Sequence, residues 1–406
     1  MNHILFVDDD ENILNGLRRR LHGMRPDWEM AFATSAAQAM EMANTMPLDV
    51  IITDMRMPGM DGASLLGALQ KSHPHITRII LSGFAEEEAV LRTVGPAHQY
   101  LAKPCEDSLL VETIENALDL RQLLAGDELR SLVASIETLA SPPDTYLRLV
   151  KALEDPKVSQ EMISQIVSSD IALTAEVLKL TNSAYFAIAQ KISSVSHAVR
   201  MIGTETLKAL ALFIGIFRGF DGPPSEADKL LRLCHRSQQI GVTAAMIAEY
   251  EQLPRAICQA VPSTGMLSHV GSLILYANRN QEMAEVIKRV ETEHIPIEQA
   301  ELEQFGAAHP EVGAYLLGLW GFPAPVVQAV AYHHRPMDQP HREMNVLTSI
   351  YVAQHLTREV GQKESGIDAP SQIDLDYLAS IGKADSLGEW ENIARIVADK
   401  YKSLTQ

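Results

Sequence analysis

The chain has 406 residues, 46% of them hydrophobic, and carries a formal net charge of −18 at pH 7. This length exceeds what one hydrophobic core usually serves, so we expect two or three domains. The negative charge argues against DNA as a partner, because DNA binding relies on basic side chains that neutralise phosphates.

The first predicted strand ends in a run of carboxylates. Residues 4–7 are apolar, and Asp8 and Asp9 follow them directly. The apolar residues 50–52 likewise lead to Asp54, after which a loop rich in Pro and Gly begins. In an open α/β sheet the carboxyl ends of parallel strands meet at one edge, so we expect these carboxylates to share a pocket. Such a pocket requires a counter-cation, and oxygen ligands alone suit Mg²⁺.

Two further strand ends add a hydroxyl and an ammonium group. Residues 78–81 lead to Ser82, and residues 99–102 lead to Lys103, which precedes a proline. Asp54 can then act as a nucleophile toward a phosphoryl group. Lys103 and the metal would offset charge on the phosphoryl oxygens, while the Ser82 hydroxyl would bond one of them. The strand ends therefore predict a carboxylate that receives phosphate.

These motifs, in this order, resemble the receiver domain of bacterial two-component response regulators over residues 1–122. The resemblance implies an α/β fold with a doubly wound, flavodoxin-like sheet of five parallel strands, and Mg²⁺ as cofactor. It also implies that Asp54 is the phospho-acceptor, and that Lys103 and Ser82 assist it in catalysis. Ser82 would in addition be the switch hydroxyl, with Tyr100 as its aromatic partner. The implied metal ligands are Asp8, Asp9, which binds directly, Asp54 and the backbone carbonyl of Arg56.

Helical periodicity replaces strand-like runs after Pro104. Residues 105–124 predict the last helix of the receiver. Beyond it, four apolar residues have the spacing of a two-heptad seam: Leu129, Leu132, Ile136 and Leu139. Two interpretations stay open, a helix that packs on its own domain or a dimerising helix that couples two domains. We assign residues 123–141 as this helical linker, since two prolines follow it directly.

The segment after the linker predicts helices with capped starts. Asp170 precedes one run with helical periodicity, and Ser194 or Ser196 precedes another, so these residues are candidate N-caps. The blocks at residues 163–186 and 192–203 resemble the HDOD domain, a helical relative of the metal-dependent HD phosphohydrolases.

On this resemblance, residues 142–406 form an all-helical HDOD output domain, in which residues 341–406 are the closing helices. Ala187 is one departure, since the family often has glycine at that point. The predicted fold class is therefore α/β plus all-α, with the receiver first and the helical domain second.

The resemblance raises the question of metal chemistry in the helical domain. HD enzymes assemble His ligands around an adjacent His-Asp pair, and this chain has Ser268-His269 at the matching point. A neutral hydroxyl binds divalent cations poorly and the anionic oxygen is missing, so the resemblance implies an inactive output domain with no assigned metal. The remaining candidate ligands are imidazoles, at His235, His269, His309, His333 and His334.

Two interpretations of these imidazoles stay open. Four of them could converge on zinc or iron. Alternatively they are packed or hydrogen-bonded, and the tandem His333-His334, followed by Arg335, marks a helix end where a positive charge suits the helix dipole.

The two resemblances predict a response regulator of a two-component phosphorelay. A sensor histidine kinase phosphorylates Asp54, and the HDOD domain then changes its contacts with a downstream signalling protein or with a second copy of the chain, as a homodimer. An alternative from another class is a cyclic-dinucleotide sensor or residual phosphodiesterase built on the HD-type fold. A third interpretation is a phosphate sink, a receiver that drains phosphoryl groups from a kinase and needs no action of the second domain. Apart from the receiver's own phosphorylation and dephosphorylation, we expect no enzymatic activity.

We expect neither a membrane span nor a signal peptide in this chain. The apolar run at residues 209–217, like every other in the sequence, falls well short of the ~20 residues that span a membrane. The first predicted strand begins at the N-terminus and leaves no room for a signal peptide. The three cysteines lie far apart without a CxxC pair, so neither a disulfide framework nor a zinc ribbon is indicated. We therefore expect a cytoplasmic protein without a membrane partner.

Overall fold

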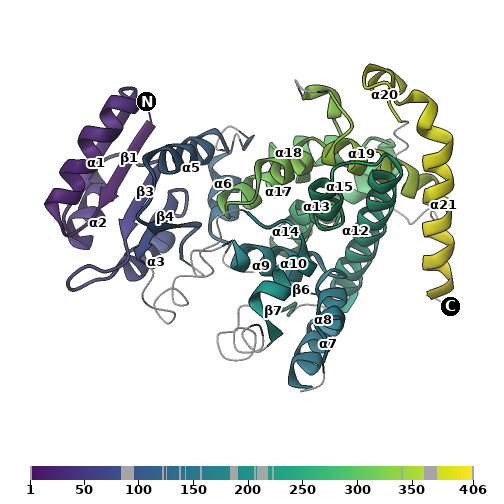
Figure 1. The fold of residues 1–406 in the computed structure, drawn as a ribbon, viewed down its shortest axis with the longest axis horizontal. Helices are drawn as coiled ribbons and strands as arrows, with labels where there is room; N and C mark the ends of the chain where they lie inside the picture. The colour runs from purple at the N-terminus through teal and green to yellow at the C-terminus, as the bar shows by residue number, and fades with distance from the viewer. Residues whose placement is uncertain are drawn as a thin grey trace. The chain divides into compact units, whose positions relative to one another are not determined.

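The structure is a computed structural model that describes most of the chain (Figure 1). The described residues are 2–83, 96–120, 123–124, 126–136, 139–141, 143–155, 158–182, 191–204, 207, 218–221, 224–339, 342–360 and 373–404. The chain divides into two compact units. One comprises Met1–Thr138, Lys179–Lys191 and Tyr315–Phe322, and the other comprises Leu139–Leu178, Ile192–Ala314 and Pro323–Gln406.

The N-terminal domain is built on a sheet of five parallel strands. They are β1 (Asn2–Val7), β2 (Trp28–Ala33), β3 (Val50–Asp54), β4 (Thr77–Gly83) and β5 (Gln99–Lys103). Their spatial order is β2-β1-β3-β4-β5. The chain changes direction across the sheet between β1 and β3, which is the switch point where open α/β sheets bind ligands. The predicted doubly wound, five-stranded parallel sheet is confirmed.

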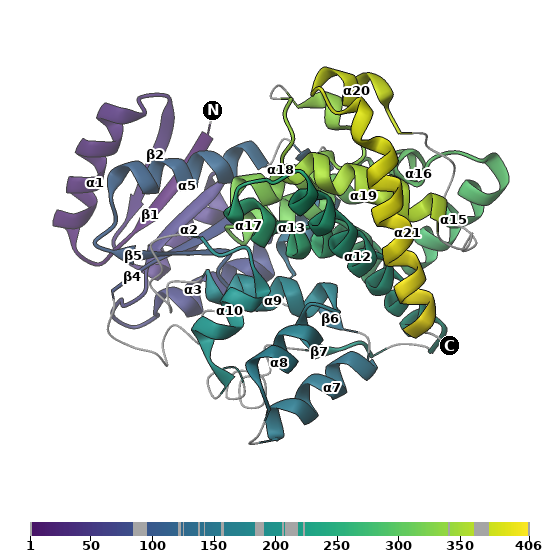
Figure 2. The same cartoon turned by 45° about the vertical axis from the view of Figure 1, so that its right-hand side comes forward.

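Helices cover both faces of this sheet (Figure 2). One face carries α1 (Glu11–Met24) and α5 (Asp107–Leu120), and the other carries α2 (Ala36–Thr45) and α3 (Gly62–Ser72). Side chains alternate along β1, so Ile4 and Phe6 pack in the core with α1 and α5, whereas Leu5 and Val7 pack with α2 and α3. The strands are apolar on both sides because both faces of the sheet are buried.

The segment after α5 differs from the helical linker predicted for residues 123–141. α6 (Asp127–Ala134) has only eight residues, and the two-residue strand β6 (Ala140–Ser141) comes next. Ile136 and Leu139 therefore lie outside the helix, and the four apolar residues do not form one seam. Leu129 and Leu139 are buried within the chain, as expected for side chains that pack on their own protein. A dimerising role for residues 123–141 stays a prediction.

The remaining described elements are helical, except for the short parallel pair of β6 with β7 (Arg218–Gly219). They are α7 (Pro143–Glu154), α8 (Gln160–Val167), α9 (Ile171–Thr181), α10 (Val195–Ile202), α12 (Pro224–Tyr250), α13 (Arg255–Leu267), α14 (Val270–Asn278), α15 (Asn280–Glu293), α16 (Ile297–Phe305), α17 (His309–Leu319), α18 (Ala324–Tyr332), η4 (Pro336–Asp338), α19 (Val346–Val360), α20 (Leu375–Ser380), η5 (Ala384–Ser386) and α21 (Leu387–Leu404). The predicted order of an α/β domain followed by a helical one is confirmed.

Glycine contacts bring the central helices of this domain together. A Cβ atom at Gly241 in α12 would lie 2.5 Å from the carbonyl oxygen of Pro262 in α13, and Gly265 faces Gly241 just as closely. The two helices therefore approach to a distance that any larger residue would prevent. α19 and α21 pack beside them (Figure 2), and Trp390 of α21 is fully buried in the same core. The predicted closing helices thus complete the core of this domain.

The predicted helix starts agree with the caps in the structure. Asp170 accepts a hydrogen bond from the backbone N–H of Leu173 at 2.9 Å at the start of α9. Ser194 does the same for His197 at the start of α10. Of the helices in the described ranges, none is both long and apolar enough to cross a membrane.

Candidate functional site

The register of the sheet brings two of the predicted carboxylates together. Val7 pairs with Thr53 across β1 and β3, so the residues that follow them, Asp8 and Asp54, are neighbours at the carboxyl edge. Asp8 is buried and Asp54 is half-buried, while Asp9 is exposed beside them. Asp54 therefore has the buried carboxylate of Asp8 as its neighbour, and the exposed Asp9 follows Asp8 in the chain.

Lys103 joins the two neighbouring carboxylates. Its Nζ donates a hydrogen bond to Asp8 Oδ2 at 2.9 Å and another to Asp54 Oδ1. Burial lowers the pKa of Lys103, but its hydrogen bonds to Asp54 and Asp8 outweigh that effect, so the pKa is raised and the amine stays protonated. The structure thus places three of the sequence-predicted residues in one charged cluster.

The charges of this cluster suit a divalent cation. Asp8, Asp9 and Asp54 supply three carboxylates against the single ammonium of Lys103, so negative charge is in excess. All the nearby ligand atoms are oxygens, which is the donor set that Mg²⁺ prefers. The residues present therefore fit the metal that the sequence predicted.

The loop after β3 folds back over Asp54. The backbone N–H of Arg56 donates to Asp54 Oδ2 at 2.7 Å, and the N–H of Gly62 donates to the Met55 carbonyl at 2.9 Å. A Cβ atom at Gly62 would lie only 2.2 Å from the Asp54 carbonyl oxygen, so glycine is required at this position. The loop thereby fixes the Asp54 carboxylate and holds the backbone of Arg56 beside it. A metal-ligand role for the Arg56 carbonyl stays a prediction.

The predicted switch residues lie on the two neighbouring strands. Asp54 pairs with Leu81 in register, so Ser82 is one residue farther along β4. Tyr100 lies on β5, half-buried against the core that includes α3. Both positions are near the carboxyl edge of the sheet, and their functions as switch residues stay predictions.

A buried polar network in the same domain was missed by the sequence analysis. The Arg78 guanidinium, on β4, donates to the carbonyls of Pro96 at 2.6 Å, Pro74 at 3.1 Å and Ala134 at 2.8 Å. His98 accepts the backbone N–H of Arg78 at Nδ1, so its Nε2 carries the proton and donates to Ala134 at 2.9 Å. Burial and the charge of Arg78 hold the pKa of His98 well below its usual value. The network connects β4 and the residues before β5 to the end of α6.

The helical domain contains a second cluster, made of imidazoles. His269 precedes α14, His309 is the first residue of α17, and His333 follows α18. One nitrogen of each lies within 4.8 Å of the other two, and all three side chains are buried. His334 adds a fourth ring, 5.1 Å from that of His309 between centroids. His235, the fifth candidate, is exposed on α12 and is outside this cluster.

Two glycines allow the rings to approach. A Cβ atom at Gly271 in α14 would lie 2.0 Å from the His309 carbonyl oxygen, and one at Gly313 in α17 would lie 3.0 Å from the backbone nitrogen of Gly271. The starts of α14 and α17 are therefore in backbone contact. This contact stacks the rings of His269 and His309 with their centroids 5.4 Å apart.

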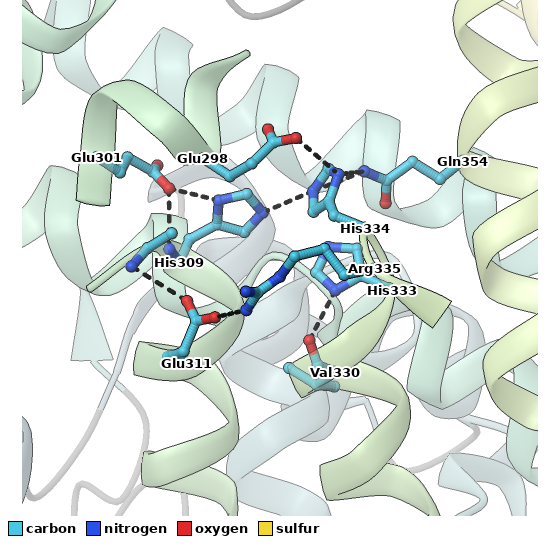
Figure 3. A network of polar contacts seen from close by, with 10 residues as sticks. Glu298, Glu301, His309, Glu311, Val330, His333, His334, Arg335 and Gln354 are labelled. Carbon is cyan, nitrogen blue, oxygen red and sulfur yellow. Dashed lines mark hydrogen bonds and ion pairs between the residues drawn. The ribbon is translucent and has the colours of Figure 1, made fainter. Parts of the chain in front are cut away.

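Three of the four rings are shown with the neighbouring groups that orient them in Figure 3. The Nδ1 of His309 donates to Glu301 Oε2 at 2.6 Å, and the same oxygen accepts the His309 backbone N–H at 2.8 Å. The Nδ1 of His333 donates to the Val330 carbonyl at 2.7 Å. Gln354 approaches Nε2 of His334 with its side-chain amide at 2.9 Å. The rings are thus held in fixed orientations by contacts from the surrounding helices.

The tandem His333-His334 lies at a helix end, as predicted, since His333 is the C-cap of α18. Burial lowers the pKa of His333 to about 3, and it holds the pKa of His334 well below its usual value, so both rings are neutral. The exposed Arg335 carries the positive charge at this helix end and pairs with Glu311. For His309, burial lowers the pKa, but the charge and hydrogen bond of Glu301 outweigh that effect and raise it.

Glu301 and Gln354 are members of this cluster that the sequence analysis missed. Glu301 is fully buried on α16, and its carboxylate bonds the ring of His309, which lies eight residues later in the sequence. Gln354 lies on α19, far from the other members in sequence. A Glu or Gln in an amphipathic helix is ordinarily a surface residue, so only the packing of the helices identifies these two.

A small cavity opens beside the imidazoles. Its lining includes His269, His309, His334, Gln354 and Arg236. Its volume is about 10 Å³, which is enough for a single water molecule or ion.

Family models match both parts of the chain. The response regulator receiver domain matches residues 4–115, and the HDOD domain matches residues 139–336. The chain joins a receiver domain to an HDOD domain. The carboxylate cluster lies in the receiver, and the imidazole cluster lies within the HDOD match, except for Gln354, which belongs to the helices that follow it.

Relatives of known sequence match parts of the chain. The hydrogenase transcriptional regulatory protein HoxA of Cupriavidus necator is 32% identical over 126 residues, covering 30% of this chain and 25% of HoxA. An uncharacterized protein of Treponema pallidum is 25% identical over 226 residues, covering 55% of this chain and 43% of its own length. The chain thus spans less than half of each of these relatives.

Among solved structures, the response regulator MmoQ of Methylococcus capsulatus is similar, with 20% identity and a TM-score of 0.47 over 63% of this chain and 98% of MmoQ. An HDOD domain protein of Geobacter sulfurreducens has 22% identity and a TM-score of 0.36, over 72% of this chain and 95% of its own.

Proposed function

We propose that this protein is a response regulator in which Asp54 accepts a phosphoryl group and thereby switches a non-catalytic HDOD domain. The observation that supports this most strongly is the cluster at the sheet edge, where Lys103 bonds both Asp8 and Asp54. A receiver domain takes its phosphoryl group from a phosphodonor such as a sensor histidine kinase, which is the first partner we propose.

The proposed transfer follows from the groups around Asp54. A carboxylate oxygen of Asp54 attacks the phosphorus of a phosphohistidine, so an O–P bond forms and the P–N bond to the donor imidazole breaks. Lys103 is already bonded to this carboxylate, and its ammonium is positioned to bond a phosphoryl oxygen. Water later attacks the phosphorus, which releases inorganic phosphate and restores the carboxylate.

A bound Mg²⁺ would neutralise negative charge on the phosphoryl oxygens. Asp8, Asp9, Asp54 and the backbone carbonyl of Arg56 are the residues we propose as its ligands. The excess of carboxylates over ammonium groups at this edge supports that assignment, since an oxygen-rich anionic pocket favours a hard divalent cation.

The switch would act through β4 and β5. We propose that the Ser82 hydroxyl bonds the new phosphoryl group and that Tyr100 moves inward behind it. His98, two residues before Tyr100, bonds the Ala134 carbonyl at the end of α6. A shift of β5 therefore has a direct hydrogen-bonded connection to the helix that leads toward the HDOD domain.

The HDOD domain then acts, on this proposal, by binding a signalling protein or a second copy of the chain. The carboxylate expected of a metal-dependent hydrolase is replaced by His269, which supports a non-catalytic output. The cavity beside the imidazoles has room for about one water molecule, which disfavours the alternative of a cyclic-dinucleotide sensor or phosphodiesterase at this point.

The phospho-acceptor is tested with acetyl phosphate and Mg²⁺ on the full-length chain. Intact-mass spectrometry and a phosphate-affinity gel should show one added phosphoryl group on the wild type and none on Asp54→Ala. Asp27→Asn is the matched control, because Asp27 is an exposed carboxylate of the same domain. Stoichiometric labelling of Asp54→Ala would show that another residue is the acceptor.

The output is tested by co-purification from native lysate. The receiver is locked with Mg²⁺ and beryllofluoride, and Asp54→Ala is treated in the same way. We expect a partner, or a second copy of the chain, to be enriched only with the locked wild type. Equal recovery with both proteins would contradict an output gated by Asp54.

A further inference from the structure

The imidazole cluster of the HDOD domain gathers three buried rings with one nitrogen of each within 4.8 Å of the other two. We propose that His269, His309 and His333 bind one divalent transition-metal ion, with Zn²⁺ as the ion that best fits the donors. This inference is independent of the phosphorylation of Asp54. It rests on how the rings converge, on the atoms they present, and on the residues behind them.

The convergence itself is the first support. The three rings come from the starts of α14 and α17 and from the end of α18, and their ligand atoms lie within 4.8 Å of one another. Their centroids are 5.4 to 5.7 Å apart. Small side-chain rotations bring such nitrogens to the ~2.1 Å bonds of one Zn²⁺. Three side chains from three separate helices thus each bring one nitrogen to within 4.8 Å of the other two.

The second support is the nitrogen that His333 presents. Its Nδ1 bonds a carbonyl oxygen, which can only accept, so Nδ1 carries the proton and Nε2 carries the lone pair. That Nε2 is buried and has no hydrogen-bond partner among the described residues. A buried nitrogen lone pair without a partner is costly in a folded protein. A metal ion in the space between the three rings would satisfy it.

The third support is the arrangement behind His309. Glu301 is fully buried and bonds Nδ1 of His309 at 2.6 Å. A carboxylate that fixes the ring of a metal-binding His from behind is the usual outer partner in zinc sites, since it orients the ring and raises its basicity. The other oxygen of Glu301 has no hydrogen-bond partner in the described chain. A buried carboxylate needs a nearby positive charge, which the ion would supply through His309.

The donors also select the ion. Three imidazole nitrogens are borderline ligands that suit Zn²⁺ and related transition metals, whereas Mg²⁺ and Ca²⁺ require oxygen. Three protein ligands leave one position open, and the adjoining cavity, lined by His269, His309 and His334, holds about one water molecule. His269, which replaces the expected carboxylate, therefore supplies a nitrogen ligand in its place.

The inference is tested on the full-length protein after metal removal with a chelator. Co²⁺ and then Zn²⁺ are titrated in excess Mg²⁺, which occupies the oxygen site of the receiver. We expect one ion per chain, visible Co²⁺ absorption bands that Zn²⁺ abolishes, and a Zn²⁺-dependent rise in Tm. A folded wild type that binds neither ion would overturn the proposal.

Variants distinguish the imidazole site from any other site. His333→Gln should weaken Zn²⁺ binding by roughly a hundredfold or more, and Glu301→Gln by roughly ten- to a hundredfold, because it only orients a ligand. His235→Ala, an exposed His of the same domain, is the control and should bind as the wild type does. Circular dichroism verifies folding of each variant. Unchanged affinity and an unchanged Zn²⁺-dependent Tm shift in folded His333→Gln would contradict the assignment.

Discussion

The receiver and the HDOD domain assemble polar clusters in opposite ways. In the receiver, Asp8, Asp54 and Lys103 sit where strands end, and the sheet register alone makes them neighbours. In the HDOD domain, the imidazoles come from three helices whose contact depends on Gly271 and on the buried Glu301. A cluster at a sheet edge therefore tolerates changes in packing, whereas a cluster between helices depends on every residue behind it.

The contrast between the two clusters is tested most severely at Arg78, a charged residue that the receiver buries. Replacing Arg78 by Leu would leave the carbonyls of Pro74, Pro96 and Ala134 without this donor. We expect the free energy of unfolding to fall by about 3–5 kcal/mol, since removing one partner of a buried charged network leaves the others desolvated and unpaired. Urea unfolding followed by Trp fluorescence measures the change.

The matched control for Arg78 is Arg20→Leu. Arg20 is exposed and pairs with Asp107 at 2.8 Å, so its loss should cost less than about 1 kcal/mol. A similar cost for both variants would show that burial does not govern the energetics of charged groups in the receiver.

The second prediction concerns a buried carboxyl in the helical domain. Asp170 is fully buried, and burial raises its pKa from 3.8 to about 7 despite bonds from Leu173 and Ser141. The folded state thus binds a proton that the unfolded state releases between these pH values, so its stabilising contribution is lost as pH rises toward 7. Relative to Asp170→Asn, the wild type should lose roughly 2–4 kcal/mol between pH 4 and pH 8.

Urea unfolding of both proteins across this pH range checks that prediction. Asn keeps the helix cap, so a difference in slope reports the carboxyl alone. The control is Asp374→Asn, since Asp374 caps α20 but is only half-buried. Parallel pH profiles for the wild type and Asp170→Asn would mean that Asp170 remains ionised in the folded protein.

The receiver cluster and the imidazole cluster show which parts of the molecule could be predicted from the sequence. Asp54 and Lys103 were identified because an apolar strand followed by a polar residue is a local pattern, and parallel strands bring such ends to one edge. Arg78 and Glu301 were missed because their burial is decided by helices and loops distant in sequence. The helix end at His333 was predicted, whereas the burial of its ring depends on helices distant in sequence.

The third prediction alters the contact that builds the imidazole cluster. A methyl group at Gly271 would overlap the carbonyl oxygen of His309, so Gly271→Ala must push α14 and α17 apart. We expect a loss of about 1–3 kcal/mol in unfolding free energy, together with weaker Zn²⁺ binding. Gly388→Ala is the control, because a Cβ there meets no atom within 4 Å and should stabilise α21 slightly. Zn²⁺ titration and urea unfolding of both variants give the two values.

The smallest effect on stability is expected at the receiver cluster. Lys103→Met removes the ammonium that Asp8 and Asp54 share, so the two carboxylates repel each other. Because the edge is partly open to solvent, the cost should be about 1 kcal/mol or less, and added Mg²⁺ should recover most of it by supplying the missing positive charge.

Function should be more sensitive than stability in the same variant. Lys103→Met should still accept part of the phosphoryl label, because Asp54 and the metal ligands remain, but it should enrich less of the output partner in the locked state. Lys71→Met, at an exposed position of α3, is the control for loss of a lysine. A Lys103→Met protein that is strongly destabilised even in Mg²⁺ would mean that the receiver cluster, like the imidazoles, is held together by its surroundings rather than by its strands.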